Sequence, residues 1–180
     1  IATSLTKVYT SADLLTADAN NPTLRAQFLQ AIEEVATGFR TTATQLTDIA
    51  QGVTDTATAE VNLFNGELQA LEEINAGLRK ARAGSTNQAS LMDRRDQLID
   101  QLSAKGGINV SFDNRGAATV RASDSGELLL SAGYRAELSA SVSATGLISY
   151  SIDGSTPFAT TRGSLAGFAE AASHLRGDIQ

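Results

Sequence analysis

The sequence of 180 residues contains no cysteine, no tryptophan and one histidine, and only 5% of its residues are aromatic. The absence of cysteine excludes disulfide bonds, thiolate metal sites, iron–sulfur clusters and cysteine nucleophiles. A single histidine excludes metal sites built from several histidines, and leaves His174 as the one imidazole for a Ser–His–Asp arrangement. This composition is more typical of a structural protein than of a catalyst.

Charge and hydrophobicity narrow the choice of partners. Twenty acidic residues against fourteen basic ones give a net charge of −6, which argues against nucleic acid as the main partner. Hydrophobic residues make up 42% of the chain, too many for a disordered segment. No apolar run approaches the roughly 20 residues that a membrane-spanning helix requires, so we expect no membrane partner.

The strongest pattern in the sequence is one apolar face of a long helix. It takes fifteen steps over the 54 residues from Leu24 to Leu78, or 3.6 residues per step, which is the period of a straight α-helix. Asn21 and Pro22 are typical of a helix start, so we expect a helix over about 22–83. The core face is predicted to contain Phe28, Val35, Phe39, Leu46, Val61, Phe64, Leu68, Leu71 and Leu78.

Gly52 leaves two interpretations of this helix open. Gly52 followed by Thr54 and Asp55 could end one helix and begin the next, which would give an antiparallel hairpin. The apolar face passes Gly52 without changing direction, so we favour one unbroken helix. Between Ala57 and Leu78 the steps alternate strictly between four and three residues, which predicts a coiled-coil seam.

A second helix and a β-region follow. Gly84 indicates a turn, and Ser90 with Asp93 is typical of a capping box, so an antiparallel helix is expected over about 88–105. After Gly107 the apolar period changes to two, as in β-strands. The strand candidates, five in all, are 108–112, 118–122, 127–130, 136–142 and 147–152.

The helical period returns near the end of the sequence, while residues 1–20 show no sustained period. We therefore predict an α+β fold, with a helical bundle domain of residues 1–106 and an inserted antiparallel β-domain of residues 107–160. Residues 161–180 would be a helix that returns to the bundle.

Candidate chemical groups are few. The run Asp93-Arg94-Arg95-Asp96 could bind an anion or take part in catalysis, but charges three or four residues apart on a helix more often form ion pairs or subunit contacts. His174 has no cysteine or carboxylate cluster beside it. We therefore predict a structural role for Asp93, Arg95 and Asp96, and expect no enzyme, no cofactor and no metal site.

Asn75 is a polar residue on the apolar seam, and Asn65 lies ten residues before it on the flank. A buried asparagine in a helical seam lowers stability but fixes the register and the partner of the helix. The alternative is an exposed asparagine at the rim of the seam. We assign Asn65 and Asn75 to a register or packing motif.

Three segments carry a family resemblance. The segment Val61–Leu78, with its V-x-x-x-N start, and the segment Leu91–Ile99, which is similar to L-L-D-Q-R-D-x-L-L, resemble the flagellar hook-associated protein 1 family. Arg162–Phe168 is similar to the family's G-x-L-x-G-L return into the bundle. Arg94 departs from the pattern, since the family usually has Gln or Glu there. The N- and C-terminal heptad segments of the family are absent, so the resemblance implies a core fragment.

The resemblance implies a flagellin-like long-helix bundle and a structural function. The subunit would be secreted through the flagellar export apparatus and would join the hook to the filament outside the cell. Implied partners are copies of itself in a ring, the hook protein, the second junction protein or flagellin, and an export chaperone that binds the missing C-terminus. The competing class is the ligand-binding helical ectodomain of a bacterial receptor, in which a membrane span would flank the fragment.

Overall fold

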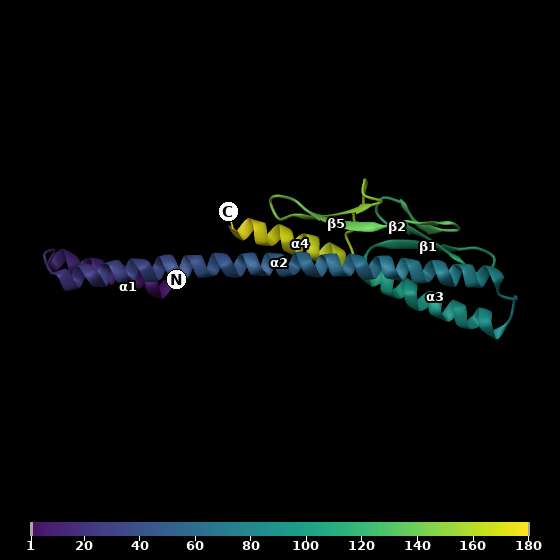
Figure 1. The fold of residues 1–180 in the computed structure, drawn as a ribbon, viewed down its shortest axis with the longest axis horizontal. Helices are drawn as coiled ribbons and strands as arrows, with labels where there is room; N and C mark the ends of the chain where they lie inside the picture. The colour runs from purple at the N-terminus through teal and green to yellow at the C-terminus, as the bar shows by residue number, and fades with distance from the viewer. Residues whose placement is uncertain (1, 180) are drawn as a thin grey trace. The chain divides into compact units, whose positions relative to one another are not determined.

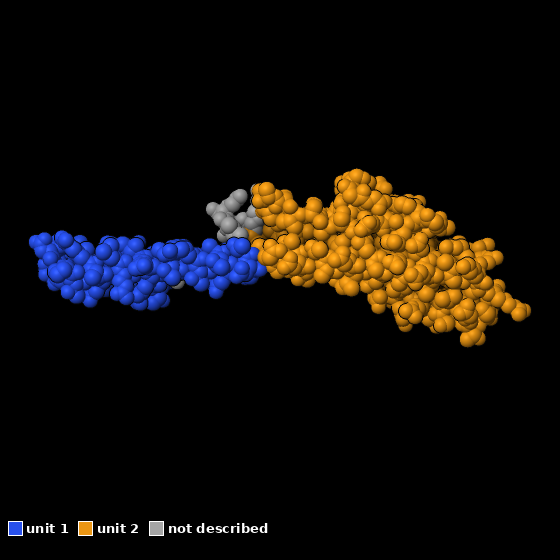
Figure 2. All heavy atoms as spheres, viewed as in Figure 1, with its two compact units in different colours: residues 1–49 blue, residues 50–180 orange. Residues whose placement is uncertain are grey.

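A computed structural model describes residues 2–179 of the chain (Figure 1). In this range the helices are α1 (Ala2–Ala17), α2 (Pro22–Lys80), α3 (Thr86–Lys105) and α4 (Gly163–Ile179), and all strands lie between α3 and α4. The predicted α+β architecture is therefore confirmed. Two compact units, residues 1–49 and residues 50–180, are described separately below (Figure 2).

The unit of residues 1–49 contains a helix that the sequence does not predict. α1 has no fully buried side chain among the residues described, although Val8, Ala12 and Leu15, which are spaced by four and three residues, are half-buried. This apolar face is too short to show a sustained helical period in the sequence. It is tied to α2 by an exposed ion pair, in which the Lys7 ammonium lies 2.9 Å from the Glu34 carboxylate. Such an exposed pair contributes about 0.2–1 kcal/mol.

α2 begins as the sequence predicts. The side-chain oxygen of Asn21 accepts hydrogen bonds from the backbone N–H groups of Thr23 and Leu24, at 3.0 and 3.3 Å, and Pro22 is the first helical residue. The helix continues through Gly52 to Lys80, so the favoured unbroken helix is confirmed and the hairpin alternative is wrong. It ends three residues before the predicted position.

The start of α3 differs from the prediction. The N-cap is Ser85, whose hydroxyl accepts a hydrogen bond from the Gln88 N–H at 3.2 Å, while the Gln88 side chain accepts one from the Gly84 N–H at 2.8 Å. Ser90, the predicted cap, lies inside the helix. The same type of motif occurs at Ser85-x-x-Gln88, directly after the turn. The first N–H groups of a helix have no partner within the helix, so a capping motif is effective there and not at Ser90.

The two serines give a direct test of this correction. Ser85→Ala is expected to lower the free energy of unfolding by about 1 kcal/mol, because an N–H at the start of α3 loses its partner. Ser90→Ala is the matched control and should be neutral or slightly stabilising, since alanine favours a helix interior. Chemical denaturation measures both, and equal losses would contradict the assignment of Ser85 as the cap.

The predicted antiparallel β-domain consists of two sheets, which contain two more strands than the five predicted. Two-residue strands at Tyr134–Arg135 and Thr156–Pro157 are too short to show a period of two, so the sequence does not indicate them. In the first sheet the strand order is β1-β2-β3-β4, and in the second it is β5-β6-β7. The bounds are β1 Ile108–Phe112, β2 Ala118–Ala122, β3 Leu128–Ser131, β4 Tyr134–Arg135, β5 Leu138–Val142, β6 Ile148–Ile152 and β7 Thr156–Pro157.

Helices and sheets in residues 50–180 share one hydrophobic core, with the strands packed along the second half of α2 (Figure 1). The division at residue 106 into a helical domain and a β-domain therefore does not coincide with the compact units, and it stays a prediction. The buried core is built from α2, α3, α4 and both sheets, and it includes Ala57, Val61, Phe64, Leu68, Leu71, Leu102, Val120, Leu130, Leu138, Tyr150, Phe158 and Leu165.

The return of the chain into the helical layer depends on Gly163. Its φ is +79°, and a Cβ at this position would lie 2.5 Å from the carbonyl carbon and oxygen of Lys105, the last residue of α3. Only glycine allows both the conformation and the approach. The Tyr150 hydroxyl then donates to the Leu165 carbonyl at 2.8 Å, and burial, assisted by the Glu60 charge, raises the pKa of Tyr150 to about 12.

Candidate functional site

The predicted core face of α2 is buried along only part of its length. Val61, Phe64, Leu68, Leu71 and Leu78 are at most 3% exposed. Phe28, Val35 and Leu46 are half-buried, and Phe39 is 54% exposed, so its prediction as a core residue is wrong. The physical reason is coverage: the sheets, α3 and α4 cover the face in residues 50–180, whereas α1 covers only part of it in residues 1–49.

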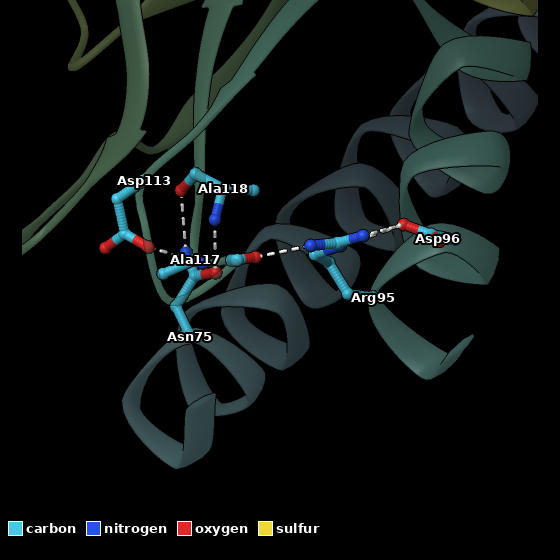
Figure 3. A network of polar contacts seen from close by, with 7 residues as sticks. Asn75, Arg95, Asp96, Asp113, Ala117 and Ala118 are labelled. Atoms are coloured by element: carbon cyan, nitrogen blue, oxygen red, sulfur yellow. Dashed lines mark hydrogen bonds and ion pairs between the residues drawn. The ribbon is translucent and has the colours of Figure 1, made fainter. Parts of the chain in front are cut away.

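Asn75 connects α2 to the first sheet. The side chain is 1% exposed, its amide nitrogen donates to the Ala118 carbonyl at 2.8 Å, and its oxygen accepts from the Ala118 N–H at 2.7 Å (Figure 3). Asn75 is therefore buried and does not lie on an exposed rim. Its partner is the backbone of β2 in the same chain and not a neighbouring helix.

Asn65 repeats this geometry on the second sheet. Its amide nitrogen donates to the Leu138 carbonyl at 2.7 Å, and its oxygen accepts from the Leu138 N–H at 2.8 Å. We call each such pair an amide clamp, so that the chain has an Asn65 clamp on Leu138 and an Asn75 clamp on Ala118. Ten helical residues, about 15 Å of α2, separate the two clamps.

Each amide clamp satisfies backbone groups that lack a strand neighbour. β5 is an edge strand of its sheet, and β3 pairs with β2 only at Val120 and Arg121, beyond Ala118. A primary amide carries both a donor and an acceptor, so it replaces one residue of a neighbouring strand. Aspartate would lack the donor and leucine would lack both groups.

Arg95 fixes the turn between β1 and β2. Its guanidinium donates to the Gly116 carbonyl at 2.5 Å, lies 2.7 Å from the Asp96 carboxylate, and covers the Phe112 ring at 4.2 Å from the centroid. The Arg95 side chain is 11% exposed and that of Asp96 is 58% exposed, so the guanidinium is buried while its carboxylate partner lies at the surface. Asp93 is exposed on the same helix.

The turn itself is held by Asp113. Its carboxylate accepts a hydrogen bond from the N–H of Ala117 at 2.9 Å (Figure 3). It accepts a second one from the N–H of Arg115 at 2.8 Å. These two bonds hold the pKa of Asp113 below its ordinary value. The turn thereby brings the Arg95 contact and the Asn75 clamp side by side.

The arrangement has the character of a structural joint. The Arg95 groups bind a carbonyl, a carboxylate and a ring of the same chain, which does not favour the anion-binding alternative for this run. Among the side chains that the structure describes, those of residues 2–175, no group of three or more from His, Asp and Glu is placed to hold a metal ion. Within residues 2–179 no helix is both long and apolar enough to cross a membrane.

Arg95→Lys tests the guanidinium geometry. We expect a loss of about 1–2 kcal/mol in the free energy of unfolding, because an ammonium cannot reach the carbonyl, the carboxylate and the ring face together. Arg94→Lys, on the exposed side of the same turn, is the matched control and should change stability little. If both variants melt like the parent, the joint does not depend on Arg95.

Comparison with known proteins gives the family. Residues 1–179 match the model described as the helical domain of the flagellar hook-associated protein FlgK. The chain belongs to this family. Flagellar hook-associated protein 1 of Escherichia coli (strain K12) is 27% identical over 123 residues, which make up 67% of this chain and 22% of the relative. The chain thus spans about a fifth of the length of that relative.

Membership of the FlgK helical domain family confirms the resemblance inferred from the motifs at 61–99. It gives no support to the receptor ectodomain alternative. Within this domain, sequence reasoning identified Asn65, Asn75 and Arg95 but missed their partners. Those partners are backbone groups of Ala118, Leu138 and Gly116, and a backbone group leaves no mark in the sequence.

Proposed function

We propose that this chain is part of a structural subunit that joins the bacterial hook to the filament by non-covalent packing. The supporting observation is the apolar surface of residues 1–49. Exposed large apolar side chains occur along both helices of this unit, and protein surfaces of this kind mark interaction sites. They are Leu5, Tyr9, Leu14, Leu29, Ile32, Phe39 and Ile49, with exposed fractions between 39% and 72%.

The partners follow from the proposed position. Copies of the same subunit would form a ring, with the hook protein on one side and the second junction protein or flagellin on the other. The subunit would reach this place outside the cell through the flagellar export apparatus, with a chaperone bound to a C-terminal segment beyond this sequence. A chain without cysteine suits such a route, because it forms no disulfide before or after export.

Residues 50–180 would supply a rigid outer part. The amide clamps fix both sheets on α2, and the outward face of β5 and β6 is polar. Serine hydroxyls pair across these strands at 2.9 Å, between Ser139 and Ser151 and between Ser141 and Ser149. A polar face of this kind suits a surface in contact with water.

The proposed function is tested by adding purified full-length protein to isolated hooks and viewing the hook ends by electron microscopy. Ordered addition of the parent is expected. Phe39→Asp should keep the helical circular dichroism of the parent and lose the addition, because a charge replaces an apolar contact. Thr44→Asp, at an exposed polar position of the same helix, is the control and should add normally. No addition of the parent, or equal addition of Phe39→Asp, would contradict the proposal.

A further inference from the structure

Asn65 is followed by Gly66, and this is the one Asn-Gly dipeptide in the sequence. In such a dipeptide the backbone nitrogen of the glycine can attack the side-chain carbonyl carbon of the asparagine. The new C–N bond closes a succinimide ring and ammonia leaves. Water then opens the ring to aspartate or isoaspartate. Glycine favours the attack because it has no Cβ to shield its nitrogen and adopts the required backbone angles easily.

We propose that Asn65 is a site of spontaneous deamidation. The Asn65 clamp prevents the reaction while β5 is docked on α2, and the reaction becomes possible when the sheet undocks. No enzyme and no co-reactant other than water is required. The proposal concerns a chemical modification of this domain and does not depend on its place in the flagellum.

The docked structure blocks the reaction in two ways. Asn65 and Gly66 lie inside α2, where helical angles hold the Gly66 nitrogen in the backbone ladder and away from the preceding side chain. The side-chain amide is held at both ends by Leu138, at 2.7 and 2.8 Å. Succinimide formation therefore requires release of the clamp together with local opening of the helix.

The product cannot restore the amide clamp. Aspartate at position 65 would accept a hydrogen bond from the Leu138 N–H, but it would place a second acceptor against the Leu138 carbonyl. Isoaspartate would add a methylene to the backbone and interrupt the ladder of α2. The aspartate or isoaspartate at position 65 therefore marks chains in which the second sheet has undocked.

The chain contains its own comparison site and a tolerated blocking substitution. Asn75 forms the same clamp on the same helix but precedes Ala76, whose Cβ hinders the attack. Gly66 itself is exposed, and a Cβ built on it meets no other atom within 4 Å. Gly66→Ala should therefore keep the fold and block the reaction.

The test incubates the chain at neutral pH, with and without denaturing urea, and follows each asparagine by peptide mass spectrometry. In urea, deamidation at Asn65 should exceed that at Asn75 by about tenfold or more, because glycine leaves the nitrogen unshielded. In native buffer the Asn65 rate should fall by about tenfold or more, since only the locally opened fraction reacts. Gly66→Ala should lower the rate at Asn65 in urea to that of Asn75.

Three results would overturn the proposal. The first is equal rates at Asn65 with and without urea, which would show that docking gives no protection. The second is a rate at Asn65 in urea no higher than that at Asn75. The third concerns the Asn65→Asp variant. If it has the circular dichroism and the melting temperature of the parent, and amide exchange at Leu138 is unchanged, then the product restores docking.

Discussion

Leu68→Asp is expected to abolish folding of residues 50–180, with loss of the cooperative melting transition. Leu68 is 0% exposed and lies in the core shared by α2, α3, α4 and both sheets. Truncating a buried leucine costs about 2–5 kcal/mol, before any cost of burying a charge is added. An unpaired buried carboxylate adds several kcal/mol more, and the sum approaches the whole stability of a domain, about 5–15 kcal/mol.

The matched control is Leu63→Asp on the same helix. Leu63 is 57% exposed, so a carboxylate there stays in water and the change in stability should be small. Thermal melting followed by circular dichroism measures both variants. A Leu68→Asp protein that melts cooperatively near the temperature of the parent would contradict the assignment of the core.

Asn75→Ala should cause the second largest loss, about 2–5 kcal/mol, because the N–H and C=O of Ala118 both lose their partner in a buried site. The fold should persist, since the other core contacts remain. Asn62→Ala, at an exposed position of α2, is the control and is expected to be nearly neutral. Urea denaturation gives the free energies, and a loss at Asn75 no larger than that at Asn62 would show that the clamp does not stabilise the unit.

The helices were predictable from sequence where burial imposes a period. The apolar face of α2 and the cap at Asn21 gave its start and its continuity, because a face that packs along its length must repeat every 3.6 residues. α1 was not predicted because its apolar face is short and none of its described side chains is fully buried. α3 begins at Thr86, with Ser85 as its cap, because a second capping motif lies nearer the turn. Phe39 was misplaced since a period states which side faces inward but not whether anything covers it.

The site was half predictable for a related reason. Asn75 interrupts an apolar seam, so its polarity signals a specific partner. The partner could be a helix, another subunit or a strand. It is Ala118, which lies 43 residues further along the chain, and no pattern in the sequence connects the two positions. The division of the strands into two sheets was not predicted either. Here the reason is strand length, because β4 and β7 are each two residues long and show no period.

Amide hydrogen exchange at Ala118 and Leu138 tests the central claim, that two asparagines of α2 hold the two sheets in place. In the parent both amides should be strongly protected. Asn75→Ala should lower protection at Ala118 more than at Leu138, and Asn65→Ala should do the reverse, because each clamp serves its own sheet. The claim is contradicted if each variant leaves its own partner amide as protected as it is in the parent.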